Sequence, residues 1–389
     1  MQNSKNLFIS YFFPPSDNIS GIVLAKRIIN DNKKVDVLTT SQDSKLTDFE
    51  NALNPFIENK IIIPTSKSAD SPEGIEEFIE NSINKLPDNY KTVTSRSWLM
   101  SNHFLALIYK LKNPDVYWKA EFSDPLLHDI KNTINIKDRH KIKNRDFIDM
   151  LNSHIKDFPK LKYSSSTFYT IEYMTFLFAD EIVFTNTNQK DMMTDQFPID
   201  LKSLIQKKST VSPHPTLPEK YYHLTKTDFR LNHDYINIAY FGNFHYPERN
   251  FNALFEAFDK LNSDKIRLYI FISNRKAINH NSKNIFIKRP LSYLEFLNAT
   301  TIFDVLIVSD ASTKDNWPVN PYLPSKLSDY LGSDTDIWAI TEKDSPLDKV
   351  SVKYKSGVDD VSSALKVLNR ISKNTKSSLP KRLFHKLMK

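Results

Sequence analysis

The feature that most constrains this chain is the alternation of short apolar runs with longer segments whose apolar residues recur every three or four positions. Short apolar runs predict buried β-strands, and the longer segments predict amphipathic helices. The expected strands are residues 6–12, 34–39, 60–63, 92–95, 115–122 and 180–186 in the first half, and residues 237–242, 266–272, 285–287, 304–308 and 337–341 in the second. Strands that alternate with helices form parallel sheets covered on both faces, so the sequence predicts an α/β fold with two doubly wound domains.

Length and polar segments predict where the domains divide. A chain of 389 residues exceeds what one hydrophobic core usually supports. The first domain is expected over residues 1–215 and the second over residues 216–375. Residues 376–389 mix apolar side chains with lysine and arginine, which predicts a basic C-terminal helix. That helix would either pack back on the first domain or contact anionic lipid, and a short frayed terminus is the simpler alternative.

The amino-acid composition limits the kinds of ligand and partner that we expect for this protein. The net charge of +7 favours an anionic ligand, such as a nucleotide or an acidic lipid surface. No zinc finger or aromatic RNA-binding motif occurs, so nucleic acid is not expected. The absence of cysteine fits a reducing, cytoplasmic location, and no apolar run reaches the length of about 18 residues that a membrane span needs. The Asp334-Thr335-Asp336 segment is interpreted as a turn, and we expect neither a metal site nor a cofactor.

Glycine is scarce, and its positions are informative. Gly21, Gly242 and Gly332, three of only five glycines, lie at expected strand–helix junctions, where backbone geometry often demands glycine. The loop at Ser20 and Gly21 can bring backbone N–H groups towards a ligand, although a plain tight turn explains it equally well.

The segment 320–332 predicts a short helix that begins beyond the carboxyl end of a strand. Ser325 is the expected N-cap, and Gly332 is expected to end the helix in the left-handed conformation. Open α/β sheets bind ligands at such positions, and free helix N–H groups favour an anion. Lys326 adds a positive charge and Asp329 follows one turn later on the same face, which suits a phosphate and a sugar hydroxyl of a nucleotide diphosphate. A capped core helix with an exposed Lys–Asp pair is an equally good interpretation.

Two further charged residues lie at the ends of expected elements. Arg249 precedes a helix, where a cation is unfavourable unless it meets an anion. Asp124 follows the strand 115–122 and is a candidate acidic or acceptor-binding group, although a solvated turn aspartate before Pro125 is the simpler interpretation. Residues 128–160 are polar with broken apolar spacing, which predicts mobile helices or a lid-like insertion.

Four segments together resemble bacterial glycosyltransferases of the GT-B fold and are similar to glycosyltransferase family 4. They are Tyr-Phe-Phe-Pro-Pro at 11–15 with Ser-Gly at 20–21, Trp-Lys-Ala-Glu-Phe-Ser-Asp-Pro at 118–125, Phe-Gly-Asn at 241–243 with Arg249, and Pro-Ser-Lys-Leu-Ser-Asp-Tyr-Leu at 324–331. The resemblance implies two Rossmann-like domains with a cleft between them, the first for the acceptor and the second for the nucleotide sugar. In the family a basic pair grips the diphosphate; Arg249 matches its second member, and Asn243 stands where the first is often arginine. The acid of the fourth segment binds the ribose, a role that falls to Asp329.

The chain departs from the family at one position. Pro321 stands where the family's E-x7-E pattern has its first glutamate. Contacts to the donor sugar are therefore expected from Asn320 or from the backbone near Tyr322. Whether the reaction retains or inverts the anomeric configuration stays open.

The resemblance implies transfer of a sugar from a nucleotide diphosphate donor to a saccharide or lipid-linked saccharide acceptor, without a metal. The product would be a bacterial surface polysaccharide or glycoconjugate, made in the cytoplasm or at the inner face of the membrane. Arg249, Lys326 and the helix start at Ser325 would stabilise the leaving diphosphate, and Asp124 would face the acceptor as a base. Two alternatives remain: a non-catalytic GT-B scaffold or carbohydrate-binding subunit, which Pro321 favours, and a sugar-nucleotide epimerase on the same fold.

Overall fold

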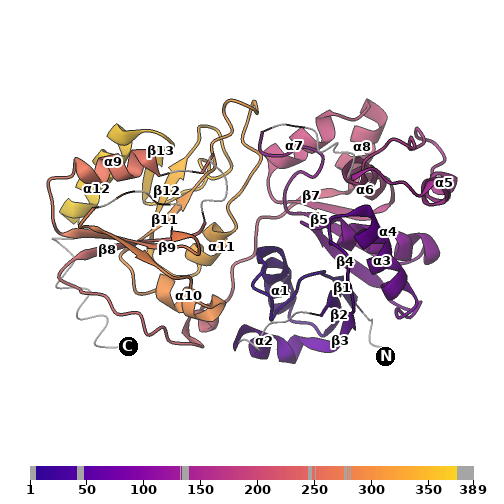
Figure 1. Ribbon diagram of the computed structural model, residues 1–389, viewed down its shortest axis with the longest axis horizontal. Coiled ribbons are helices and arrows are strands. Elements are labelled where there is room, and N and C mark those ends of the chain that lie inside the picture. The colour runs from indigo at the N-terminus through magenta and orange to yellow at the C-terminus, as the bar shows by residue number, and fades with distance from the viewer. Residues whose placement is uncertain are drawn as a thin grey trace. The chain divides into compact units, whose positions relative to one another are not determined.

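The computed structural model describes residues 6–41, 48–131, 133, 140–243, 248–249, 251–275, 278, 280 and 282–374. The chain divides into two compact units, Met1–Pro215 and Thr216–Lys389. Within the described residues, no helix is long and apolar enough to cross a membrane. Each unit has its own sheet and its own hydrophobic core (Figure 1).

The first unit is built on a parallel sheet, which has seven strands among the described residues, in the order β3-β2-β1-β4-β5-β6-β7. The strands are β1 Asn6–Ile9, β2 Val35–Thr40, β3 Ile57–Ile63, β4 Thr92–Ser97, β5 Tyr117–Phe122, β6 Glu181–Phe184 and β7 Ser209–Val211. Strand β2 is buried along its whole length, as expected for a strand covered on both faces. The pairs β1–β4 and β4–β5 hold Ile9 opposite Ser95 and Ser97 opposite Phe122.

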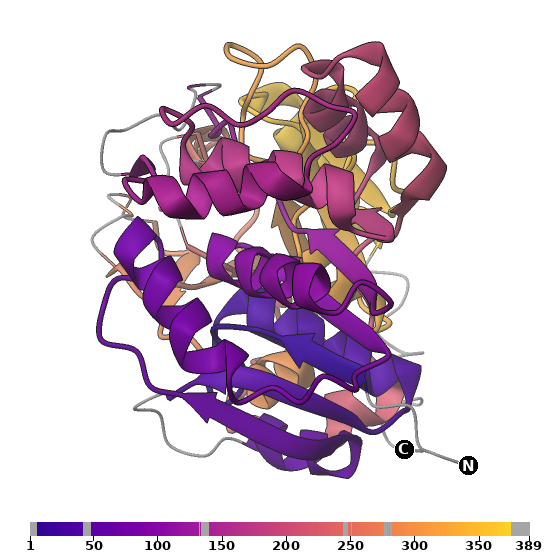
Figure 2. The same cartoon turned by 90° about the vertical axis from the view of Figure 1, so that its right-hand side faces the viewer.

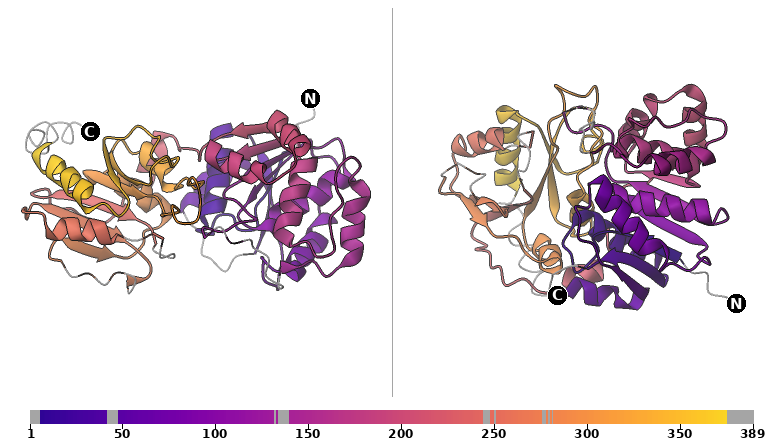
Figure 3. Two further views of the ribbon diagram at one scale, coloured as in Figure 1. Left: turned by 90° about the horizontal axis from the view of Figure 1, so that it is seen from above. Right: turned by 45° about the vertical axis from the view of Figure 1, so that its right-hand side comes forward.

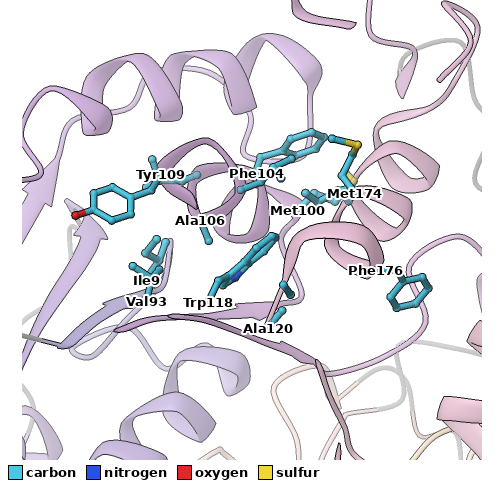
Figure 4. Packing of buried hydrophobic residues seen from close by; sticks show 14 of the residues in the cluster. Ile9, Val93, Met100, Phe104, Ala106, Tyr109, Trp118, Ala120, Met174 and Phe176 are labelled. Carbon is cyan, nitrogen blue, oxygen red and sulfur yellow. The ribbon is translucent and has the colours of Figure 1, made fainter. Parts of the chain in front are cut away.

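Helices cover both faces of this sheet. They are α1 Ile19–Asp31, α2 Asp48–Leu53, α3 Pro72–Ile83, α4 Met100–Lys112, α5 Arg145–His154, α6 Thr167–Phe178, α7 Thr187–Asp195 and α8 Ile199–Lys208. Helices α3, α4 and α6 pack side by side as one layer, which Figure 2 shows face on, and Figure 1 shows α1 on the opposite side of the sheet. The core lies between that layer and the sheet, where Val93 and Trp118 meet Phe104 and Ala106 (Figure 4).

The second unit is built on another parallel sheet, with six strands among the described residues, in the order β10-β9-β8-β11-β12-β13. The strands are β8 Ile236–Phe241, β9 Ile266–Phe271, β10 Ile285–Lys288, β11 Val305–Ser309, β12 Asp336–Thr341 and β13 Tyr354–Gly357. Its helices are α9 Asn252–Asp259, α10 Tyr293–Thr300, α11 Lys326–Leu331 and α12 Val361–Asn374, with a 3-10 turn at Glu219–His223.

The helices of the second unit also divide between the two faces. Helices α9 and α12 lie side by side over one face (Figures 1 and 3), where Tyr240 and Trp338 join the core. On the other face α10 brings Phe296 against Phe241 and Tyr330, with ring centroids 5.0 and 6.3 Å away. Because successive side chains of a strand point to opposite faces of the sheet, Tyr240 packs on one face and Phe241 on the other.

Both sheets reverse their strand order at one place, between β1 and β4 and between β8 and β11. At such a place the loops that follow the two strands run to opposite faces and leave room for a ligand beyond the carboxyl ends. The α/β architecture with two parallel sheets is therefore confirmed. Of the segment 128–160, residues 145–154 form α5; the expected helix at 376–389 lies outside the described residues.

Candidate functional site

In the second unit, the loops that follow β8 and β11 are joined directly at the reversal of strand order. The backbone N–H of Ser312 donates to the carbonyl of Glu248 at 2.7 Å. This bond places Arg249, the next residue, beside the segment that begins at Asp310. Arg249 therefore lies at the edge of the sheet where a ligand is expected.

Gly242 makes room for the side chain that holds Arg249. A Cβ atom at Gly242 would lie 2.6 Å from the Tyr240 hydroxyl, so the phenol ring occupies the space a side chain would need. That hydroxyl is hydrogen-bonded to Arg249. Burial raises the pKa of Tyr240, and Arg249 lowers it again in part. The Nε atom of Arg249 is buried and has no hydrogen-bond partner in the part of the chain that the structure describes. Asn243 accepts from the N–H and the hydroxyl of Ser273, at 3.1 and 2.8 Å.

Two buried acids follow the neighbouring strands. Asp310, directly after β11, accepts from the N–H of Glu342 at 2.9 Å and from the hydroxyl of Ser345 at 2.6 Å. Glu342, directly after β12, accepts from the N–H and the hydroxyl of Thr313. Burial raises the pKa of Asp310 to about 7; the hydrogen bonds from Ser345 and from the N–H of Glu342 oppose this rise, as does Arg249, whereas the negative charge of Glu342 adds to it. Like the Nε atom of Arg249, the Oδ1 atom of Asp310 has no hydrogen-bond partner within the described ranges, so this edge holds two titratable groups with an unsatisfied atom.

Asn320 belongs to the same network. Its amide nitrogen donates to the carbonyl of Ala311 at 2.9 Å and to Glu342 at 2.8 Å, and its oxygen accepts from the N–H of Tyr322. Asn320 is almost fully buried and Tyr322 is half-buried. The two residues therefore shape the loop between β11 and α11.

The predicted helix forms, but its ends differ from expectation. Ser325 is the N-cap residue of α11, as predicted, but it has helical dihedral angles and its hydroxyl makes no cap bond, so the predicted capping interaction is wrong. Gly332 has φ −90°, so the prediction of a left-handed glycine is also wrong. Its role is close approach: a Cβ there would lie 2.2 Å from the Tyr222 hydroxyl. That hydroxyl donates to the carbonyl of Asp329 at 2.7 Å.

Lys326 and Asp329 both contact aromatic side chains on the α10 side of the sheet. The Lys326 ammonium lies 4.9 Å from the centre of the Phe296 ring. The Asp329 carboxylate accepts from the Tyr293 hydroxyl at 2.9 Å, and its side chain is mostly buried. Burial, together with Asp329, raises the pKa of Tyr293 far above its usual value, so this phenol stays a donor. Arg249 is bound to Tyr240, which belongs to the core on the α9 side of the sheet.

In the first unit, Gly21 lies within the first turn of α1. The Asn18 side chain caps the helix and accepts from the N–H groups of Ser20 and Gly21 at 3.0 and 3.4 Å. A Cβ at Gly21 would lie 2.2 Å from the carbonyl oxygen of Phe12. Glycine is required here so that α1 can pack against the loop after β1.

Asp124 lies beside a buried ionic cluster that sequence reasoning missed. Glu121 is fully buried and binds Arg96, its partner in the β4–β5 register, and the Arg27 Nε atom at 3.1 Å. Burial alone would raise the pKa of Glu121, but Arg96 and Arg27 outweigh it and hold the pKa below its usual value. Asp124 is half-buried two residues beyond β5 and interacts electrostatically with Arg96.

The residues that were missed share one sequence signal. Glu121 is the next-to-last residue of β5, and Asp310 and Glu342 directly follow β11 and β12. A charged residue that interrupts or ends a buried run is costly unless it is paired. That cost could have marked these positions, but nothing in the sequence named their partners.

No family model matches the chain, and a search of curated proteins finds no relative. Solved structures do match over nearly the whole length. A structure described as trehalose-6-phosphate from E. coli bound with UDP-2-fluoro glucose is 8% identical, with a TM-score of 0.58 over 95% of this chain and 91% of its own. The lipopolysaccharide outer core galactosyltransferase WaaB is 12% identical, with a TM-score of 0.53 over 94% and 90%. A putative UDP-N-acetylglucosamine 2-epimerase from Listeria monocytogenes is 12% identical, with a TM-score of 0.55 over 96% and 89%.

These likenesses define the fold. The two parallel Rossmann-like sheets match structures of the GT-B fold, among them a galactosyltransferase, a structure bound with UDP-2-fluoro glucose and a putative UDP-N-acetylglucosamine 2-epimerase. At 8–12% identity the likeness shows the fold alone.

Proposed function

We propose that this protein is a glycosyltransferase that moves a sugar from a nucleotide diphosphate donor to a saccharide or lipid-linked saccharide acceptor. The observation that carries the proposal is Arg249 at the reversal of strand order in the second unit, with a buried Nε atom that has no hydrogen-bond partner among the described residues. A half-buried arginine with an incompletely satisfied Nε atom at a ligand edge suits an anionic ligand. The names of the fold neighbours, several of which mention UDP, suggest a nucleotide sugar as that ligand.

In this proposal Arg249 and Lys326 bind the diphosphate and stabilise the charge that grows on it as the glycosidic bond to the donor breaks. Helix α11 spans only Lys326–Leu331, so its dipole adds little to the two side-chain cations. Asp329 binds the ribose, with its carboxylate held in place by Tyr293. Asn320 and Tyr322 shape the loop that faces the donor sugar, and Asn243 positions the turn after Gly242.

Asp124 in the first unit is proposed to bind the acceptor hydroxyl and to take its proton as the new bond forms. Glu121 and Arg96 are proposed to position the strand end that carries Asp124. No step of this scheme uses a metal, and the leaving group is stabilised by side chains alone.

Arg249→Ala and Lys326→Ala should each lower turnover by roughly 10²-fold, because each removes a charge that stabilises the leaving group. The measurement is release of free nucleoside diphosphate in the presence of acceptor, screened with UDP-, GDP-, ADP- and dTDP-sugars. Arg370→Ala and Lys366→Ala, two exposed residues of α12, are matched controls and should leave turnover unchanged. Full activity in both the Arg249 and Lys326 variants would refute these roles.

Two alternatives are separated by related measurements. The first alternative is a non-catalytic GT-B subunit, which Pro321 favours. Calorimetry with the free nucleoside diphosphates tests it: if none of them binds, the non-catalytic subunit is favoured. An epimerase is suggested by the fold neighbour from Listeria monocytogenes. Conversion of a nucleotide sugar without any acceptor would favour the epimerase and exclude the transferase.

A further inference from the structure

Trp98 is a large exposed aromatic side chain of the first unit that its packing does not explain. It follows β4 directly and is 53% exposed, whereas Trp118, Trp317 and Trp338 are each at most 7% exposed. Its one aromatic contact among the described residues is with Phe12, at a ring-centroid distance of 6.3 Å and an interplanar angle of 45°. A large aromatic side chain left exposed at the reversal of strand order is placed to meet a ligand.

The register of three strands places Trp98 in a row with Phe12 and Asp124. Ile9 pairs with Ser95, so three residues further on Phe12 lies next to Trp98. Ser97 pairs with Phe122, and the N–H of Ser123 donates to the carbonyl of Ser97 at 3.2 Å. The carboxyl ends of β1, β4 and β5 therefore present an aromatic ring, an indole and, one residue beyond Ser123, the carboxylate of Asp124.

The two aromatic residues are held by buried contacts. Asn102 of α4 accepts from the N–H of Tyr11 at 2.7 Å and donates to the carbonyl of Arg96 at 2.8 Å, which ties the ends of β1 and β4 together. Gly21 lets α1 pack against the backbone of Phe12. A surface whose backbone is fixed in this way loses little conformational entropy when it binds a ligand.

We propose that Trp98 and Phe12 form the acceptor subsite, on which the apolar C–H face of a pyranose ring stacks while one of its hydroxyls reaches Asp124. This inference deepens the proposed function and rests on it for the class of ligand. The surface combines one indole, one half-buried ring and a carboxylate, which suits an amphipathic sugar. A lipid chain would instead need a continuous apolar patch of several hundred Å².

Saturation-transfer NMR tests the proposal on the full chain, with methyl glucoside, methyl galactoside and methyl N-acetylglucosaminide as probes. In the wild type, saturation should concentrate on the ring protons of one face. Trp98→Ala should reduce the transfer about fivefold or more, and Trp98→Phe should retain most of it, because a smaller aromatic ring still stacks. Tyr117→Ala is the matched control, since Tyr117 is 47% exposed at the opposite end of β5. The same sugars should protect Trp98 from acrylamide quenching.

The outcomes are distinct. No transfer from any of the three probes, or equal loss in Trp98→Ala and Tyr117→Ala, overturns the proposal. Saturation of the alkyl protons of octyl glucoside, with none on its ring protons, reassigns the surface to lipid and also overturns it. Wild-type calorimetry with nucleoside diphosphates distinguishes failure of the proposed function from failure of the subsite. Sugar binding without nucleotide binding would contradict the proposed function and leave the subsite standing. Nucleotide binding without sugar binding would contradict the subsite alone.

Discussion

At the scale of single residues, the glycines of the second unit show how a missing side chain positions a functional one. Gly242 and Gly332 each leave space for a tyrosine hydroxyl, those of Tyr240 and Tyr222. The first hydroxyl binds Arg249, and the second binds the backbone of Asp329. Both glycines are thus explained by close approach, although neither has a positive φ.

Gly332→Ala should destabilise the protein by about 1–3 kcal/mol, because the new methyl group would overlap the Tyr222 ring and force it to move. Chemical unfolding in urea measures the change. Gly357→Ala is the control, since its Cβ would meet only the Asp360 side chain, at 3.3 Å. Equal stability of the two variants would show that the Tyr222 ring moves aside without a loss of unfolding free energy.

Glu172 in α6 makes the stability of the first unit depend on pH. It is fully buried and accepts from the N–H of Leu127 at 3.3 Å and from Gln196 at 2.6 Å. Burial raises its pKa to about 8 from an ordinary 4.5, so between these values the folded state holds a proton that the unfolded state has released. Stability from this group is complete below pH 4.5 and is lost as the pH rises through 8.

Glu172→Gln should therefore gain stability relative to the wild type as the pH rises from 5 to 9. The difference in unfolding free energy between variant and wild type, measured in urea at several pH values, is the readout. Glu256→Gln, at an exposed position of α9, should give a difference that does not change with pH. A flat profile for Glu172→Gln would mean that the carboxyl group is solvated in solution.

At the scale of elements, ion pairs inside the first unit join strands that are distant in sequence. Glu121 of β5 bonds Arg96 of β4 and Arg27 of α1, and Arg27 also donates to the carbonyls of Ser212 and Pro213 at 3.2 and 3.0 Å. One buried carboxylate thus connects two strands, a helix and the segment that ends the unit.

Glu121→Ala should cost about 3–5 kcal/mol, because it leaves Arg96 buried without its carboxylate. Arg27→Ala should cost less, since Arg27 is partly exposed and Glu121 keeps Arg96 as a partner. Urea unfolding of both variants gives the comparison. A larger loss for Arg27→Ala would place the main contribution in the bonds to Ser212 and Pro213.

At the scale of the whole molecule, each unit has a separate core, so a ligand can stabilise one unit more than the other. Under the proposed function, a nucleoside diphosphate at 100 times its dissociation constant adds about 2.7 kcal/mol to the state that binds it. Hydrogen exchange should then slow in β8 and β11, around Arg249, more than in β2 and β3. Slowing confined to the strands of the first unit would contradict a donor site in the second.

The amino-acid sequence by itself determined the architecture. The alternation of apolar runs with helical spacing is a local property, and it predicted the parallel sheets and eleven of the thirteen strands among the described residues, but not the short strands β7 and β13. The candidate residues Arg249, Lys326 and Asp329 were also marked locally, by their places after strands.

Tertiary structure alone decided what those residues touch. The binding of Tyr293 to Asp329, of Asn320 to Glu342 and of Glu121 to two arginines joins positions 22 to 94 residues apart. The absence of a cap bond at Ser325 and the φ of Gly332 follow from packing around α11. Local sequence cannot determine such contacts, because each depends on which distant side chain the completed sheet brings alongside.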